Sequence, residues 1–124
     1  MTNSNTNAAV SFLKLASSGK VKEAYSKYVG EGFKHHNPFF AGSAEPLRAG
    51  MEENAKQNPN KILEVKRAIA EGDFVVTHSH VQQKPGELGA AVVHIFRFEN
   101  GKIVELWDLG QPVPEKSVNE NGMF

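Results

Sequence analysis

Two side chains that can exchange protons, His94 and Asp108, lie in a stretch that otherwise suits two β-strands around an Asn-Gly turn. The stretch is VVHIFRFENGKIVELWDLGQP, residues 92–112. Burial raises the pKa of a carboxyl group and lowers that of an imidazole, while their mutual attraction opposes both shifts. On one buried face the two would form an acid–base pair near neutral pH. The alternative is a hydrogen-bonded core pair, or an aspartate that caps the strand end before Gly110, and the stretch is compatible with both.

The geometry of the turn decides whether the two groups share a face. In one geometry, Asn100 and Gly101 are the two loop residues of a type I′ turn. His94 then faces Trp107, and Asp108 lies on the opposite face of the ribbon. In the other geometry, Gly101 is a left-handed bulge residue after a type I turn. His94 and Asp108 are then diagonal neighbours on one face, about 7–8 Å apart at the backbone.

The apolar pattern favours the bulged register, because a shift of one residue exchanges the two faces of a strand. Five apolar residues gather on one face in this register: Val92, Phe96, Phe98, Val104 and Leu106. The other face carries Val93, Ile95, Ile103 and Trp107, with Arg97 and Glu105 left to pair. The register loses a surface ion pair between Glu99 and Lys102, worth only about 0–1 kcal/mol. We therefore predict a bulge at Gly101, with His94 and Asp108 on the apolar face.

Two further segments carry histidines. In FKHHNPFF, residues 33–40, an extended backbone places His35 on the side of Phe33 and His36 on the other side, and Asn37 is held extended by the proline that follows it. In FVVTHSHVQ, residues 74–82, His78 and His80 share one face of a strand. The residues on their face are Phe74 and Val76, and those on the other face are Val75, Thr77, Ser79 and Val81. The pattern leaves open which face looks inward.

The H-x-H pair, together with a histidine on the next strand, raises the hypothesis of a metal site, since two imidazoles on one face can chelate. This spacing is loose, and no further carboxylate stands at a fixed offset, so we expect no metal. No Gly-rich phosphate loop, G-x-S-x-G elbow or H-E-x-x-H motif occurs. The chain has no cysteine, which excludes thiolate chemistry and disulfides. We expect no cofactor.

Length and charge bound the class of protein. A chain of 124 residues fits one domain with a proper core, and we assign residues 1–124 to it, with a core over about 8–114. Fourteen basic residues balance fourteen acidic ones without a basic stripe, so we expect neither nucleic acid nor a membrane as partner. The N-terminal stretch lacks the pattern of a signal peptide, and no apolar run approaches the ~20 residues of a membrane helix. We expect a cytoplasmic protein.

Hydrophobic spacing predicts helices first and strands second. Helices are expected over residues 8–18 and 21–29, the second ended by Gly30 and Gly32. A third follows Ser43 as N-cap and ends before Pro59. Alternating patterns then predict strands at 62–72, at 73–83, from the 84–87 loop to about 98, and from 102 to about 109. Short turns between them imply an antiparallel meander. The predicted fold class is α+β, with three N-terminal helices packed on one face of a bent antiparallel sheet.

The helix order, the HNP of residues 36–38 and the block FRFENGKIVELWDLGQPVP, residues 96–114, resemble the SnoaL-like polyketide-cyclase group of the nuclear-transport-factor-2-like (NTF2-like) superfamily. The resemblance spans about residues 12–114. It implies a cone, a cystatin-like α+β roll in which a strongly curved sheet wraps a long helix around an apolar pocket. It also implies a homodimer formed through the outer face of the sheet.

The resemblance also implies roles for residues. His94 and Asp108 match the catalytic positions, where the aspartate abstracts a proton next to a carbonyl and the histidine stabilises or protonates the oxygen, without metal or cofactor. His36 and Asn37 match a motif at the pocket mouth. We add four candidate substrate-binding residues, His78, His80, Phe96 and Trp107. The chain departs from many relatives, which carry His before the Trp-Asp pair where this chain has Leu106, and some carry Asp at the position of His94.

Three functional hypotheses follow. The first is a cofactor-independent enzyme of the aldol-cyclase, isomerase or hydratase kind, which acts on a small apolar carbonyl compound. The second is a non-catalytic module for binding small molecules or for dimerisation. The third is a histidine-ligated metal protein. The C-terminal residues 117–124 are expected to form a mobile end, unless Met123 and Phe124 anchor it.

Overall fold

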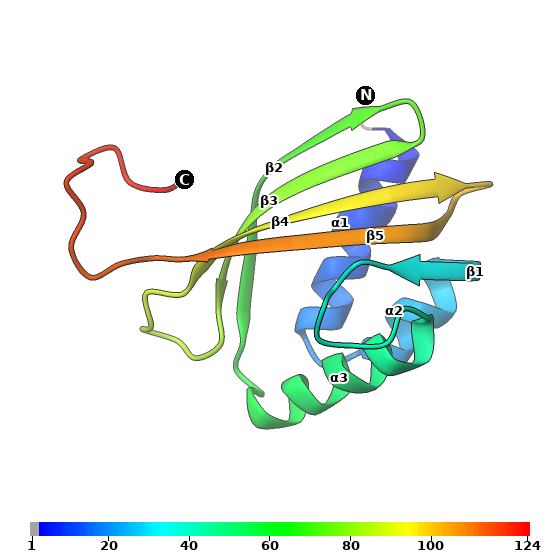
Figure 1. Ribbon diagram of the computed structural model, residues 1–124, viewed down its shortest axis with the longest axis horizontal. Coiled ribbons are helices and arrows are strands. Elements are labelled where there is room, and N and C mark those ends of the chain that lie inside the picture. Colours follow the sequence, from blue (N-terminus) through cyan, green and yellow to red (C-terminus); the bar gives the residue numbers. More distant parts are fainter. Residues whose placement is uncertain (1–2) are drawn as a thin grey trace.

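The computed structural model describes residues 3–124, and over this range the chain forms three helices and five strands. The helices are α1 (Ser4–Ser17), α2 (Val21–Tyr28) and α3 (Ala44–Gln57). The strands are β1 (Val29–His35), β2 (Ile62–Glu71), β3 (Phe74–Gln82), β4 (Ala90–Glu99) and β5 (Lys102–Pro112). The predicted α+β class is confirmed, and Figure 1 shows the sheet bending around the helices. Within residues 3–124, no helix combines the length and apolarity needed to cross a membrane.

The four predicted strands form the expected antiparallel meander, in the order β5-β4-β3-β2. A fifth strand, β1, extends this sheet by pairing in parallel with β5. The sequence pattern did not predict β1, because Gly30 and Gly32 lower strand propensity and read as helix breakers. The strand matters for function, since it leads directly into the loop at residues 36–43.

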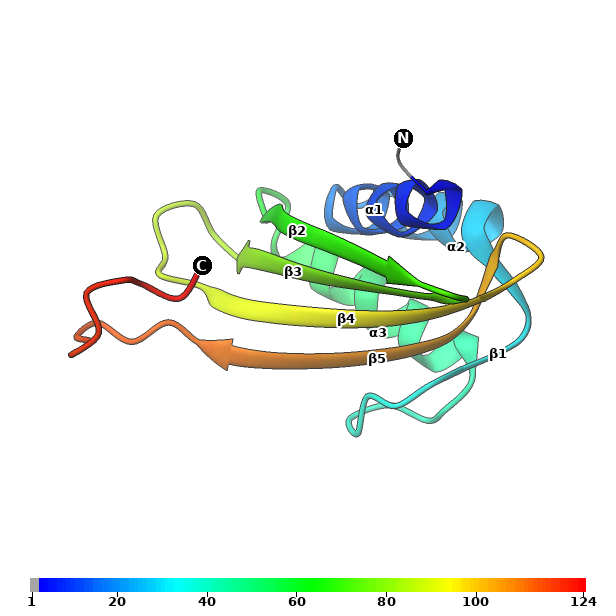
Figure 2. The same cartoon turned by 90° about the horizontal axis from the view of Figure 1, so that it is seen from above.

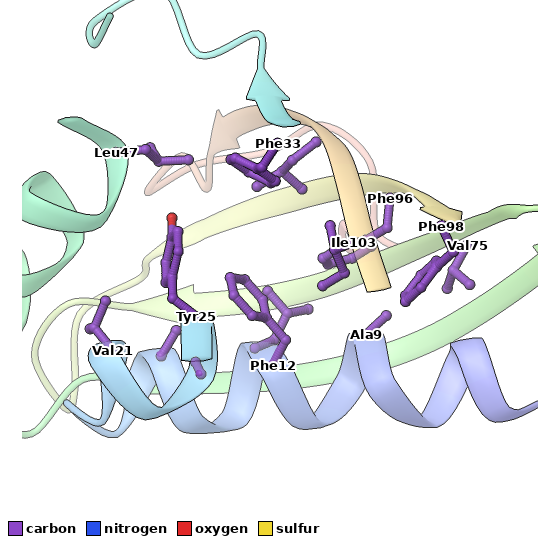
Figure 3. Packing of buried hydrophobic residues seen from close by; sticks show 14 residues of the cluster. Ala9, Phe12, Val21, Tyr25, Phe33, Leu47, Val75, Phe96, Phe98 and Ile103 are labelled. Atoms are coloured by element: carbon purple, nitrogen blue, oxygen red, sulfur yellow. The ribbon is translucent and has the colours of Figure 1, made fainter. Parts of the chain in front are cut away.

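The helices cover the concave face of the sheet, as the view from above shows (Figure 2). Helix α1 begins where the Asn3 side chain accepts hydrogen bonds from the amides of Asn5 and Thr6. It lies across the inner face and buries four apolar residues, Ala9, Phe12, Leu13 and Ala16. The Phe12 ring meets Tyr25 of α2 and Phe96 of β4 in tilted and edge-on contacts (Figure 3). This aromatic cluster joins both layers into one core.

The turn between β4 and β5 differs from our prediction. Asn100 and Gly101 have φ angles of 50° and 77°, both in the left-handed region, and Glu99 pairs with Lys102. The connection is therefore the two-residue turn of the type I′ kind, and the predicted bulge at Gly101 is wrong. Asn-Gly suits this turn because glycine and asparagine tolerate positive φ at little cost.

A bulge nevertheless lies in this hairpin, further along β5. Phe98 faces Ile103 and Arg97 faces Glu105, so Val104 is the extra residue. Ile103, which we expected on the outer face, is consequently buried in the core. Beyond the bulge, Phe96 faces Leu106 and His94 faces Asp108. His94 and Asp108 therefore share a face, as predicted, but the bulge that causes this lies at Val104 and not at Gly101.

Candidate functional site

A cavity of about 330 Å³ lies between the helices and the inner face of the sheet. Its size is near the lower end of the range for small-molecule sites, about 300–1,000 Å³. Most of the lining is apolar and comes from Phe12, Leu13, Ala16, Phe40, Leu47, Met51, Leu63, Val81, Val92 and Leu106. The polar lining residues are Ser17, Asn37, Asn54, Lys61, Gln83, His94 and Asp108. An apolar hollow with a few polar groups is typical of a ligand site.

His94 and Asp108 lie directly opposite each other on adjacent strands, and both line the cavity. Strand alternation turns them inward together with Phe96 and Leu106, which form the next inward-facing pair of β4 and β5. No hydrogen bond joins the two side chains in the described part of the chain. They therefore stand as separate polar groups that a ligand can contact together.

Asn37 holds the carboxylate of Asp108. Its Nδ2 donates a hydrogen bond of 3.0 Å to Oδ2 of Asp108, so the loop after β1 is tied to β5. The Asn37 side-chain oxygen accepts from the amide of Phe39 at 3.0 Å, which fixes the orientation of the amide group. One carboxylate oxygen is thus engaged, and Oδ1 is left for a ligand.

His35 shapes the loop that presents Asn37. As predicted, His35 lies on the same side as Phe33, and both are buried. Its Nδ1 accepts a hydrogen bond from the amide of Asn37 at 3.1 Å, and its Nε2 lies 2.6 Å from the carbonyl oxygen of Ala41. Because Nδ1 accepts, Nε2 carries the proton and donates. His35 therefore supports the site without lining the cavity.

Burial lowers the pKa of His94 to about 4, an effect that the negative charge of Asp108 opposes and the positive charge of Lys61 reinforces. The imidazole is therefore neutral at pH 7. Its Nδ1 is buried and has no hydrogen-bond partner among the described residues, which leaves Nε2 as the nitrogen that can face a ligand. Thr77, whose hydroxyl is also buried and unpartnered, lies opposite His94 on β3.

Two candidate residues, His36 and Trp107, lie on the outer face of the sheet and not at the cavity. Their rings stack with centroids 4.8 Å apart and an angle of 6°. His36 Nε2 also lies 2.7 Å from Oε2 of Glu105, and Arg97 donates to the other oxygen at 2.9 Å. These contacts hold the pKa of Glu105 below its usual value, chiefly through the bond with His36. The expected place of His36 at the pocket mouth is therefore wrong, because strand alternation turns it outward.

The structure shows which face of β3 looks inward, a point that the sequence pattern left open. Thr77, Ser79 and Val81 point inward and are buried, whereas His78 and His80 point to the outer face. The three histidines behind the metal hypothesis thus do not converge, since His94 points inward. Within residues 3–124, no cluster of three or more His, Cys, Asp or Glu side chains is placed to hold a metal ion.

The remaining candidate, Phe96, belongs to the core behind the cavity. It is fully buried, and its ring stacks 6.0 Å from that of His94 without lining the cavity. Phe96 therefore supports the imidazole from behind, and the two predicted catalytic residues and Asn37 are the candidates that meet at the cavity.

Sequence reasoning missed four polar lining residues, Ser17, Asn54, Lys61 and Gln83. Burial lowers the pKa of Lys61, whose Nζ donates to the side-chain oxygen of Asn54 at 3.0 Å. A signal existed in the alternation of β2 and β3. The inward-facing pair Leu63 and Val81 implies that the next inward-facing pair is Lys61 and Gln83.

Comparison with known proteins agrees with this architecture. The family model described as the SnoaL-like domain matches residues 9–106. A search of curated proteins gives no match.

Several solved structures share the fold. The crystal structure of AclR, a proposed hydroxylase from Streptomyces galilaeus, superposes with a TM-score of 0.73 at 23% identity, over 86% of this chain and 88% of that one. A proposed polyketide cyclase from Bacillus cereus gives 0.74 at 23% identity, over 87% and 74%. A cystatin-fold protein from Novosphingobium aromaticivorans gives 0.69 at 20% identity, over 87% and 99%. At these identities the likeness shows the fold alone.

Proposed function

Because the chain belongs to the SnoaL-like domain family, we propose that it is a cofactor-independent enzyme for acid–base chemistry on a small, apolar carbonyl compound. The reaction class is aldol cyclisation, isomerisation or hydration. The observation that carries the proposal is the pairing of His94 with Asp108 across β4 and β5, with both side chains on the lining of one apolar cavity. Two of the similar solved structures are described as a proposed polyketide cyclase and a proposed hydroxylase, which supports an enzymatic role for a protein of this fold.

Asp108 acts as the general base in this proposal. Its carboxylate takes a proton from the carbon next to the substrate carbonyl. The electrons of the broken C–H bond form a C=C bond, and those of the C=O π bond move to the oxygen, which gives an enolate. The hydrogen bond from Asn37 leaves Oδ1 free to accept that proton. The bond also limits rotation of the carboxylate, which favours a fixed attack geometry.

His94 stabilises the enolate oxygen as a neutral donor. With a pKa of about 4, it cannot supply a full positive charge at pH 7, but its N–H can donate a hydrogen bond. A donor fixed in an apolar site stabilises developing negative charge more strongly than the same donor in water. In this proposal His94 donates a hydrogen bond to the enolate oxygen, and Asp108 accepts the proton from carbon.

Hydrogen–deuterium exchange tests this proposal without knowledge of the natural substrate. The protein is incubated in D₂O with a panel of small ketones and keto esters, and loss of the proton signal next to the carbonyl is followed by NMR. We expect catalysed exchange with some of the panel, and a loss of about 10²–10⁴-fold in Asp108→Asn. Asp73→Asn, the same change in the turn between β2 and β3, is the matched control and should retain the rate.

Exchange that is unaffected by Asp108→Asn would contradict the role of this base.

The second candidate function, a non-catalytic binding module, is favoured by the mostly apolar lining of the cavity. It predicts saturable binding of apolar compounds without exchange, and binding that survives Asp108→Asn. Titration calorimetry with the same panel separates the two functions.

A further inference from the structure

Lys61 brings an ammonium group into the same cavity, in a region formed by different elements from those that hold His94 and Asp108. It lies directly before β2, at the end of the loop that follows α3. The register of β2 and β3, in which Ile62 faces Gln82, places Lys61 opposite Gln83. Both side chains line the cavity, as does Asn54 from the last turn of α3.

This ammonium group lacks a carboxylate partner. None of the ion pairs in the described part of the chain includes Lys61, although several other lysines and arginines form such pairs. Its hydrogen bond goes to the neutral side-chain oxygen of Asn54, at 3.0 Å. Lys61 is half-buried, and partial burial of a cation without a counter-charge carries a cost that an anionic ligand reduces. The lowered pKa of Lys61 has this same cause, burial without compensation.

Gln83 supplies a second observation that points to a ligand. Gln83 lines the cavity, and its side-chain oxygen is buried without a hydrogen-bond partner within residues 3–124. Buried amide groups in proteins are ordinarily satisfied. The side-chain nitrogen of Gln83 is not among the buried unpartnered atoms of these residues, and its N–H groups can donate to a bound anion.

The charges in the cavity also fix the orientation of an anionic ligand. The negative charge of Asp108 repels an anion from the region of β4 and β5, whereas Lys61 attracts one to the region of β2 and α3. Lys61 and His94 both line the one cavity of about 330 Å³, so one small ligand can reach both regions. The apolar lining residues Leu63, Val81 and Val92 lie on the adjacent strands β2, β3 and β4, which lead across the sheet from Lys61 to His94.

We propose that Lys61, Asn54 and Gln83 form a carboxylate-binding subsite, and that the ligand is a small apolar carboxylic acid bound with its carboxylate at Lys61. Resting on the proposed function, the substrate is then a keto or enol acid whose carbonyl end lies at His94 and Asp108. A single ammonium with neutral amides suits the single charge of a carboxylate. Phosphate groups instead favour arginine forks or several backbone amides.

The first experiment uses the unaltered protein and a matched pair of probes, octanoate and octanamide, which have the same length but differ in charge at neutral pH. Titration calorimetry should give a dissociation constant at least tenfold lower for octanoate. Equal affinities for the two probes, or tighter binding of octanamide, would overturn the subsite. This comparison needs no variant and therefore does not depend on the folding of one.

The second experiment assigns the preference to Lys61. Lys61→Met keeps most of the apolar stem and removes the charge, so octanoate and octanamide should bind this variant within about twofold of each other. Lys56→Met, an exposed lysine in the last turn of α3, is the matched control and should keep the tenfold preference. A preference that survives Lys61→Met in a folded variant, as judged by circular dichroism, would overturn the assignment.

Asp108→Asn separates this inference from the proposed function. The subsite predicts that octanoate binds Asp108→Asn within about threefold of its affinity for the unaltered protein, because its carboxylate lies at Lys61 and not beside residue 108. A gain in octanoate affinity of tenfold or more, absent for octanamide, would place the carboxylate beside residue 108 and contradict the orientation. Carboxylate binding at Lys61 together with no catalysed exchange would refute the enzyme and leave the subsite intact.

Discussion

The imidazole of His94 connects the chemistry of single residues to the stability of the protein. Its pKa of about 4 in the folded state lies below the ordinary value of 6.5 because the ring is buried. The unfolded chain therefore binds a proton at His94 at a higher pH than the folded chain does. The neutral ring therefore contributes its full stabilisation at pH values above the pKa of the unfolded chain. This contribution is lost as the pH falls from about 6.5 to about 4.

We therefore predict that the free energy of unfolding decreases between pH 6.5 and pH 4 by up to about 3 kcal/mol through His94 alone, at roughly 1.4 kcal/mol per pKa unit. Urea denaturation at several pH values measures this slope. His94→Gln, which does not titrate, should show a shallower dependence over the same range. An identical slope in the variant and the unaltered protein would mean that other groups account for the acid sensitivity.

At the scale of strands and turns, the β4–β5 hairpin shows which structural features the sequence pattern could predict and which it could not. Alternation identified both strands, and the Asn-Gly pair identified the turn, because these signals are local. The bulge at Val104 was misplaced to Gly101, since its position depends on which side chains the helices cover. Packing of Phe98 and Ile103 under α1 sets that register, and one-dimensional patterns do not contain this information.

The same reasoning explains the errors at the candidate site. His94 and Asp108 could be found because both lie in one hairpin with a strong apolar pattern. The H-x-H pair was ambiguous, because a strand with plausible residues on both faces does not show which face is inward. Alternation correctly put His36 on the side opposite Phe33 and His35, and its expected place at the pocket mouth came from the family resemblance. Lys61 was missed because its partners come from α3 and β3, so that only the assembled sheet brings them together.

The turn itself allows a test at the level of the hairpin. Gly101 has a φ of 77°, and a methyl group added there would meet no other atom within 4 Å. Gly101→Ala should therefore destabilise the protein by about 1–2 kcal/mol through backbone conformation alone. Urea denaturation measures this loss. Gly101→Asn, which tolerates positive φ better, should recover part of it, and equal stability of Gly101→Ala and the unaltered protein would contradict the type I′ turn.

At the scale of the whole molecule, the helices cover one face of the sheet and leave its outer face accessible (Figure 2). Large apolar side chains remain exposed there, with Ile69 at 63%, Leu109 at 60% and Phe74 at 42%. The register places all three on the face opposite the cavity. Phe124 of the C-terminal segment also packs against the outward-facing ring of His80, with centroids 4.4 Å apart. This contact fits the alternative in which the C-terminal aromatic residue anchors the segment.

We predict that this outer face joins two copies of the chain, as its connected apolar side chains are typical of an interface. Sedimentation equilibrium should give twice the chain mass of 13.6 kDa. Leu109→Glu should shift the equilibrium to monomer, because the dimer would then bury an unpaired carboxylate from each copy. Phe39→Glu, at an 85% exposed aromatic in the loop after β1, should leave the dimer intact. A monomer at all concentrations would show that the outer face serves no self-association, and octanoate binding in the cavity would be unaffected by that result.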